Sequence, residues 1–326
     1  MAYTDIDKPN NYFNTMLYTA NGAVRNITEA DTFQADLVWL KRRNAAVSHH
    51  LVDSVRGATK AMYSNTTGAE ATDSAGVTGF VTDGFSLGGQ GGYNDTGTFV
   101  SWTWKKQAGV FDIQTYTGNG SNRTISHNLG VVPKMMIIKK RNTTAPWSVG
   151  HASLGANQVL ELDVTDAVAT DNSYWNNTRP TSSVFSVGTD GNQNTDGHTY
   201  VIYLFGNKQG VSKMGSYTGN GNADGPMIVT GMKPAWVMVK KTSGTGNWMI
   251  IDNKRSASGG FNVLGERLKA NANDAGSTAD YQDHLSNGFK IRTTASSWND
   301  SGGTYIYMAF AENPFVTSTG VPATAR

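Results

Sequence analysis

The sequence predicts an all-β fold of three tandem β-sandwich-like modules of about 100 residues each, with at most one short helix. The first observation is the phrase Tyr-Thr-Gly-Asn-Gly, which stands at residues 116–120 and 217–221 and, with one change, at 18–22. Its tyrosines, numbers 18, 116 and 217, are 98 and 101 residues apart. The second is composition: 37 Gly, abundant aromatic, Asn, Thr and Ser residues, and only 16% charged residues are typical of short strands joined by many turns.

Module boundaries follow from the repeated marks. A lysine closes an apolar run 23 residues after each Tyr, at Lys41, Lys139 and Lys240. The linkers at 105–110 and 207–212 are short, so we expect closely packed units. The predicted division is an N-terminal arm over 1–11, modules over 12–108, 109–209 and 210–315, and a C-terminal tail over 316–326.

The expected strands recur in the same order in each module. A β-strand exposes alternate residues to one face, and Val100, Trp102 and Trp104 alternate with polar residues in this way. Helical spacing of Val263, Leu264 and Leu268 predicts a short helix over 262–271. The expected strands are 37–40, 50–55, 59–63, 85–87 and 98–104, then 135–140, 147–151, 159–162, 183–188 and 199–205, then 235–241, 248–252, 287–291 and 304–310.

Charge and cysteine content exclude several classes of protein. The 27 basic and 25 acidic residues are evenly mixed, which argues against a nucleic-acid-binding protein. The absence of Cys excludes disulfides, thiolate metal sites and thiol catalysis. Apolar runs are too short for membrane insertion, and the first residues lack the pattern of a signal peptide, so we expect synthesis in a cytoplasm.

The repeated marks have mainly structural interpretations. Asn-Gly favours a tight turn, so the phrase predicts a strand that runs into a hairpin. The recurring lysines could bind a sugar acid or phosphate, but a protected strand edge is favoured. Twelve residues after each lysine stand Asp53, His151 and Asp252. A catalytic acid would not alternate with His, so this position predicts a shared turn or a buried hydrogen bond.

A candidate calcium loop lies in the second module. Asp190, Asn192, Asn194 and Asp196 place oxygen atoms at alternate residues, as calcium loops do, but the terminal Glu of such loops is missing. An ordinary hairpin connection is the favoured interpretation. We therefore expect no cofactor, with Ca²⁺ as the alternative.

Two tryptophans are candidate ligand-binding residues. Trp175 and Trp298 lie in polar surroundings at matching points of late loops, so we expect both to be partly exposed. Exposed tryptophans anchor interfaces and ligands. The expected ligand is a glycan or a partner protein.

No catalytic motif is present. The sequence lacks a Gly-x-Ser-x-Gly elbow and a His-Glu-x-x-His helix, and no pair of carboxylates recurs across the repeats. We expect the protein not to be an enzyme, with a polysaccharide depolymerase as the less favoured alternative.

Four segments together resemble a family of tandem-repeat virion structural or tail-fibre-like proteins of tailed bacteriophages, especially marine ones. They are Met-Ala-Tyr-Thr-Asp-Ile-Asp-Lys-Pro at 1–9, Asp-Ser-Val-Arg-Gly at 53–57, Gly-Ser-Tyr-Thr-Gly-Asn-Gly at 215–221 and Glu-Asn-Pro-Phe at 312–315. The resemblance covers nearly the whole chain and brings no catalytic residues with it.

The resemblance implies a non-enzymatic virion component, assembled in the cytoplasm of the host bacterium. The expected role is a tail fibre, spike or capsid decoration that serves host attachment or particle stabilisation, with a host-glycan receptor as the alternative. The expected partners are other virion proteins. The chain would form a homotrimer or act as a pseudo-three-fold monomer.

Overall fold

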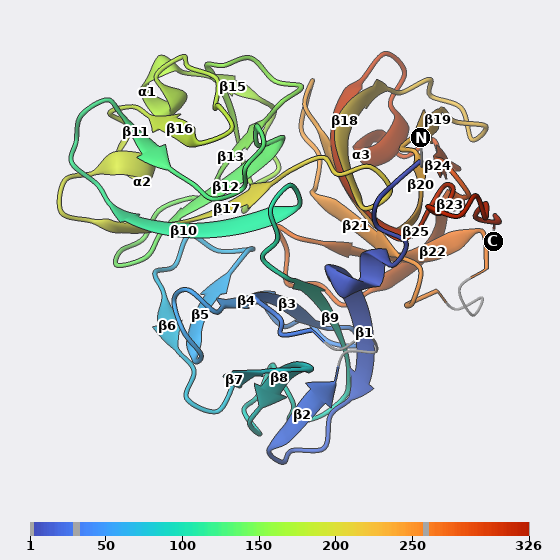
Figure 1. Cartoon of the computed structure of the whole chain (residues 1–326), viewed down its shortest axis with the longest axis horizontal. Coiled ribbons are helices and arrows are strands. Elements are labelled where there is room, and N and C mark those ends of the chain that lie inside the picture. The colour runs from blue at the N-terminus through green and yellow to red at the C-terminus, as the bar shows by residue number, and fades with distance from the viewer. Residues whose placement is uncertain (1–2, 29–32, 257–260, 326) are drawn as a thin grey trace.

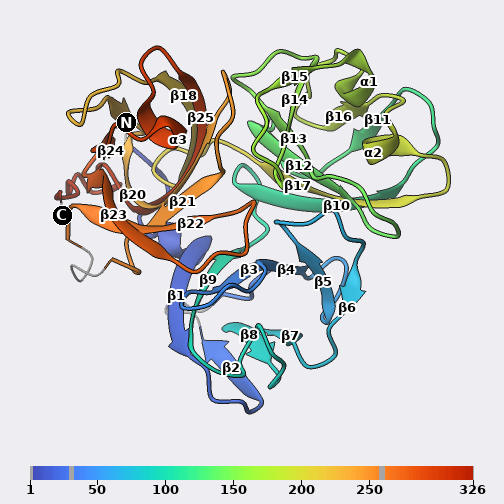
Figure 2. The ribbon, with the colours of Figure 1, turned by 180° about the vertical axis from the view of Figure 1, so that it is seen from behind.

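The computed structural model describes residues 3–28, 33–256 and 261–325. It confirms the all-β class, since β-strands form nearly all of the regular structure. The ribbon has three lobes around a common centre (Figure 1), and the view from behind shows the same arrangement (Figure 2). Each lobe contains one large antiparallel sheet whose strands come from a single repeat of the sequence.

Lobe 1 packs two sheets against each other around a core of its own. The large sheet has the order β1-β9-β3-β4-β5-β6, and the small one β2-β8-β7. The strands are β1 (Phe13–Thr19), β2 (Arg25–Thr28), β3 (Leu37–Arg42), β4 (His50–Asp53), β5 (Lys60–Tyr63), β6 (Ala71–Thr72), β7 (Val77–Val81), β8 (Gly84–Leu87) and β9 (Thr98–Trp104).

Lobe 2 repeats this plan. Its large sheet has the order β10-β17-β12-β13-β14-β15, and β11 pairs with β16 in the small sheet. The strands are β10 (Phe111–Thr117), β11 (Arg123–Ser126), β12 (Met135–Lys140), β13 (Ser148–His151), β14 (Gln158–Glu161), β15 (Ala169–Thr170), β16 (Val184–Val187) and β17 (Thr199–Phe205).

Lobe 3 joins both parts into one eight-stranded sheet of order β18-β25-β20-β21-β22-β23-β24-β19, because the long β23 pairs with β22 and with β24. The strands are β18 (Ser212–Thr218), β19 (Met227–Val229), β20 (Met232–Lys241), β21 (Met249–Asp252), β22 (Leu264–Lys269), β23 (Ser277–Leu285), β24 (Gly288–Ile291) and β25 (Thr304–Pro314).

A shared apolar core joins the three lobes. Each large sheet separates this core from the core of its own lobe, so the middle strands are buried on both faces. Trp104, Phe205 and Phe310 hold the same position in the last strand of each repeat, and their rings meet edge to face at the centre. The centroid distances are 6.1 Å from Trp104 to Phe205, 5.6 Å from Trp104 to Phe310 and 6.1 Å from Phe205 to Phe310. A pseudo-three-fold axis therefore passes through this aromatic cluster.

The prediction of at most one short helix is wrong, both in number and in place. The described residues include α1 (Asn172–Trp175), α2 (Gly191–Asn194), α3 (Ser296–Asn299) and the 3-10 turn η1 (Pro9–Asn11). The segment predicted to be helical, 262–271, contains strand β22 instead. Leu268 pairs with Ile250 and Leu264 with Gln282, so strands on both sides supply backbone partners. This sheet pairing outweighs the helical spacing of the leucines.

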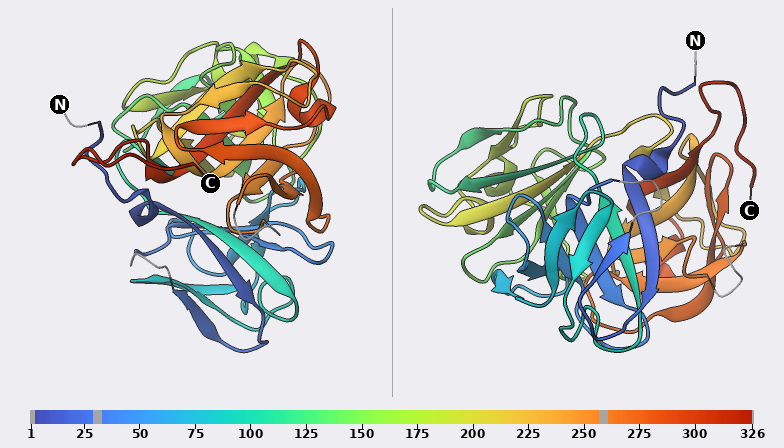
Figure 3. Two further views of the ribbon diagram at one scale, coloured as in Figure 1. Left: turned by 90° about the vertical axis from the view of Figure 1, so that its right-hand side faces the viewer. Right: turned by 60° about the horizontal axis from the view of Figure 1, so that its bottom comes forward.

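The N-terminal arm lies against lobe 3. The Tyr3 hydroxyl donates a hydrogen bond to the carbonyl of Gly231 at 2.7 Å, and the Thr4 hydroxyl donates to that of Gln209 at 2.9 Å. The Asp7 carboxylate accepts the backbone N–H of Ser318 at 2.6 Å, so the arm runs beside the C-terminal segment (Figure 3). Both ends of the chain thus meet at the same lobe. Residues 1–2 of the expected arm and residue 326 of the expected tail lie outside the described residues.

Candidate functional site

The repeated phrase forms a buried clamp in every lobe. The backbone N–H of the phrase Asn donates to Oδ1 of a second, buried Asn, whose Nδ2 donates back to the phrase side chain. The distances are 3.2 and 2.9 Å for Asn21 and Asn94, 3.1 and 3.3 Å for Asn119 and Asn194, and 2.8 and 3.0 Å for Asn220 and Asn299. The clamp ties the first strand to the loop before the last strand, so the phrase has a structural role.

Trp175 and Trp298 are buried, so the prediction that both are partly exposed is wrong. Only 3% of Trp175 and 0% of Trp298 is accessible. Trp298 is equivalent to Gln193 rather than to Trp175, because its carbonyl and that of Gln193 accept the phrase Tyr hydroxyl at 2.7 Å. The polar neighbours in the sequence belong to single helical turns, beneath which each ring packs. Neither ring is exposed on the outer surface, although an edge of Trp175 lines a pocket in lobe 2.

Three of the four predicted calcium ligands make hydrogen bonds within the protein. Asp190 caps α2 by accepting the Asn192 N–H at 2.7 Å, and the Asn192 amide donates to the Tyr174 hydroxyl at 3.0 Å. Asn194 is the clamp residue, and Asp196 is exposed. Among the described residues, no group of three or more His, Cys, Asp or Glu side chains could hold a metal ion.

The position occupied by Asp53, His151 and Asp252 links each lobe to the next. One side-chain atom of each accepts the backbone N–H two residues further on, at 3.1, 3.1 and 3.0 Å. A second atom reaches the last strand of the following lobe. Tyr203 OH donates to Asp53 at 2.8 Å, His151 Nε2 lies 3.3 Å from the Tyr307 carbonyl, and Trp102 Nε1 donates to Asp252 at 2.9 Å. The contacts run from lobe 1 to 2, from 2 to 3 and from 3 to 1, which confirms a shared structural role.

The residue three positions after Asp53, His151 or Asp252 is Arg where that position is Asp, and Leu where it is His. Buried Arg255 pairs with Asp252 at 2.5 Å, and buried Arg56 pairs with Asp53. Lobe 2 has His151 and Leu154 instead, which avoids a buried guanidinium without a carboxylate. Burial lowers the pKa of His151 to about 4, so the ring is neutral, and its Nδ1 accepts from Ser153. The proton therefore sits on Nε2, which donates to the Tyr307 carbonyl.

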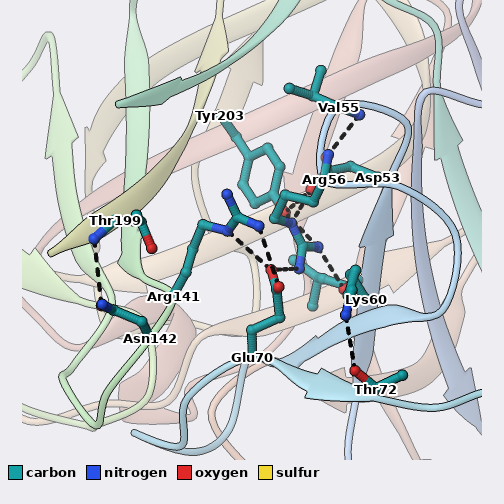
Figure 4. A network of polar contacts seen from close by, with 11 residues as sticks. Asp53, Val55, Arg56, Lys60, Glu70, Thr72, Arg141, Asn142, Thr199 and Tyr203 are labelled. Atoms are coloured by element: carbon teal, nitrogen blue, oxygen red, sulfur yellow. Dashed lines mark hydrogen bonds and ion pairs between the residues drawn. The ribbon is translucent and has the colours of Figure 1, made fainter. Parts of the chain in front are cut away.

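An ionic cluster closes the junction between lobes 1 and 2 (Figure 4). Glu70 Oε2 lies 3.1 Å from Arg56 Nη1 and 3.0 Å from Arg141 Nε. The Arg56 side chain is fully buried and also donates to the Tyr203 hydroxyl at 3.2 Å. These charges neutralise one another within the junction, as expected of a structural cluster.

The recurring lysines are buried and donate to backbone carbonyls. The interpretation of these lysines as protection of a strand edge is therefore wrong. Lys41, Lys139 and Lys240 lie on β3, β12 and β20, which pair with a strand on each side. Lys139 Nζ donates to the carbonyl of Thr67 in lobe 1 at 2.7 Å, and Lys240 Nζ to that of Asp166 in lobe 2 at 2.7 Å. Burial lowers the pKa of all three to about 8.

A pocket of about 300 Å³ lies in lobe 2 beside α1. The strand position filled by Val52 in lobe 1 and by Ile251 in lobe 3 is Gly150 here, and a Cβ atom on it would lie 2.9 Å from the Trp175 ring. Trp175 and Met136 form apolar walls, while Lys134 and Arg179 are the charged lining residues. Such a lining suits a small anion with an apolar part. A glycine at a strand position that the other two repeats fill with Val or Ile was the sequence signal for this pocket.

No helix among the described residues is long and apolar enough to cross a membrane.

Comparison with known proteins gives a family without an assigned activity. No curated protein matches the chain significantly. The profile of a family described as a domain of unknown function, DUF7483, matches residues 8–314, a range that includes strands of all three lobes. The chain therefore belongs to the DUF7483 family.

Proposed function

We propose that this protein is a structural component of a bacteriophage virion, of tail-fibre, spike or capsid-decoration type, that displays its β modules on the particle surface without catalysing a reaction. The observation that carries the proposal is the ring of equivalent contacts made by Asp53, His151 and Asp252, which closes three lobes into one body. The assignment of the protein to a phage particle rests on its resemblance to virion proteins of tailed bacteriophages.

Pseudo-three-fold symmetry fits this role. Symmetric assemblies present like surfaces around an axis, and a single chain with three similar lobes can occupy a position of three-fold symmetry as a monomer. Each lobe then contacts one subunit of a trimeric partner, while the loops, which differ between lobes, face outward. Several weak contacts made at once by one particle give strong overall attachment.

Side-chain placement favours a non-enzymatic role over a depolymerase. Glycoside hydrolysis ordinarily uses two positioned carboxylates in a cleft. The pocket beside α1 has no Asp or Glu in its lining, and Asp53 and Asp252 are fully engaged in buried ion pairs.

Two measurements test the proposal: the position of the protein on phage particles and its molecular mass in solution. Antibody labelling of purified phage particles should place the chain on the particle surface, and the isolated protein should have the 35.0 kDa mass of a monomer. A protein absent from purified particles would refute the virion role. A 105 kDa species, three times the chain mass, would replace the monomer with a homotrimer.

A further inference from the structure

The junction between lobes 2 and 3 lacks the ionic cluster of the junction between lobes 1 and 2. The backbone contact is retained: Glu70 N donates to the Arg141 carbonyl at 2.7 Å, and Val168 N donates to the Thr242 carbonyl at 3.1 Å. Val168 and Thr242 thus replace Glu70 and Arg141, and Leu154 replaces Arg56. Three charged side chains of one junction are therefore small or apolar in the other.

The third junction keeps a charged bridge. At the boundary of lobes 3 and 1, Gly276 N donates to the Arg43 carbonyl at 2.7 Å, the same backbone contact as in the other two junctions. Arg43 Nη2 lies 2.9 Å from Glu266 and spans the boundary. Two junctions are thus bridged by an ion pair, whereas Val168 and Thr242 cannot form one.

The shorter side chains leave a groove of about 450 Å³ between lobes 2 and 3. Leu154, Val168 and Thr242 all line it, so the groove lies where the ionic cluster stands in the first junction.

The lining defines the chemistry of the ligand. It contains no charged side chain, so a charged ligand would lose water without gaining a partner. Ser153, Ser216 and Thr218 are exposed and provide hydroxyls that both donate and accept. The half-buried Val168 offers the groove an apolar surface, whereas the Tyr217 ring stacks on Tyr305 at the other face of β18. A complementary molecule carries many hydroxyls, an apolar face and no charge.

We propose that this groove binds a neutral oligosaccharide. Hydroxyl-rich, uncharged sugars match the hydroxyls of β18 and of the loop after β13, and the volume lies within the range of small-molecule sites. The inference goes beyond the virion proposal and does not depend on it. Sugar binding by the isolated chain would stand even if the protein were absent from particles.

The test uses the full chain on an array of neutral hexose and N-acetylhexosamine oligosaccharides, with uronic and sialylated oligosaccharides as the acidic set. We expect binding to neutral members. The double substitution Val168→Glu/Thr242→Arg introduces the charges of Glu70 and Arg141 into the groove and should weaken binding at least about tenfold, because the longer side chains fill the space that the ligand would occupy. An unchanged thermal midpoint would show that the variant is folded.

A second variant removes hydroxyls without changing buried atoms. Ser216→Ala/Thr218→Ala should weaken binding about threefold or more. Its matched control is Thr115→Ala/Thr117→Ala, which alters the equivalent exposed positions of β10 and should leave binding unchanged. The proposal fails if no neutral oligosaccharide binds, if only acidic ones bind, or if Val168→Glu/Thr242→Arg binds as well as the wild type.

Discussion

At the scale of single residues, each buried asparagine of the clamp binds three backbone groups. Asn194 accepts from the Asn119 N–H, and its Nδ2 donates to Asn119 Oδ1, to the Ser121 carbonyl at 2.7 Å and to the Gly188 carbonyl at 2.7 Å. No other short side chain offers an acceptor and two donors in this geometry. The same residue type in all three lobes follows from this requirement.

The substitution Asn194→Ala should lower the free energy of unfolding by about 2–4 kcal/mol, because it leaves several buried polar groups without partners. Urea unfolding monitored by tryptophan fluorescence measures the effect. The control is Asp196→Ala on the exposed side of the same loop, with an expected loss below about 0.5 kcal/mol. Equal losses in the two variants would contradict the clamp.

Buried neutral histidines should make the protein sensitive to mild acid. Burial lowers the pKa of His50 and of His151 from 6.5 to about 4, so the unfolded chain takes up protons that the folded chain does not. Stability is therefore complete above pH 6.5 and falls as the pH drops toward 4, by on the order of 3 kcal/mol for each histidine. Urea unfolding between pH 7.5 and 4.5 measures this slope.

The control for the pH dependence is His151→Asn, because an asparagine can accept from Ser153 at the position of Nδ1 without titrating near neutral pH. This variant should lose less stability on acidification than the wild type does. Identical slopes would show that His151 does not contribute.

At the scale of elements, the sequence predicted the strands better than the contacts between them. The alternation of Val100, Trp102 and Trp104 identified β9 from local information alone, because side chains of a strand have a period of two. The alternation did not reveal that β9 is buried on both faces, with Ser101 and Thr103 fully buried as well. Segment 262–271 was misassigned because its partners, β21 and β23, lie outside the local window. Pairing with distant strands is not encoded in local spacing.

The site residues show the same limit. A clamp Asn stands four or five residues before the Thr that opens each last strand, as with Asn94 and Thr98, so the clamp had a signal in the sequence. The exchange of Glu70 for Val168 was also visible in the repeats. The groove that results from this exchange was not visible in the sequence, because the side chains that face these positions belong to another lobe.

The ionic cluster of the first junction should contribute more stability than the bridge of the third. Glu70→Ala leaves the fully buried Arg56 without one of its partners, and we expect a loss of about 2–4 kcal/mol. Glu266→Ala breaks a pair whose side chains are about one fifth exposed, at 22% and 20%, and should cost about 1 kcal/mol or less. Chemical unfolding of both variants compares them directly, and a larger loss for Glu266→Ala would refute this ranking.

At the scale of the whole molecule, the shared core makes the lobes depend on one another. Trp104, Phe205 and Phe310 each come from a different lobe, and each ring is buried partly by the rings of the other two lobes. The arm at Tyr3 and the segment at Ser318 bring the first repeat back to the last. The N-terminal arm and the C-terminal segment thus lie side by side at lobe 3, so the path of the chain around the three lobes is nearly closed.

A circular permutant tests this closure. A flexible linker joins the original ends, and the chain is reopened between Ala108 and Gly109, in the linker between lobes 1 and 2, where Ala108 is exposed. Because chain ends at exposed connections are tolerated, we expect one cooperative thermal transition within a few degrees of the wild type. The control reopens the chain between Val100 and Ser101, inside the central strand β9, and should not fold, because β9 pairs with both β1 and β3. Two separate transitions in the first permutant would show that the lobes fold independently and would remove the shared core as the source of cooperativity.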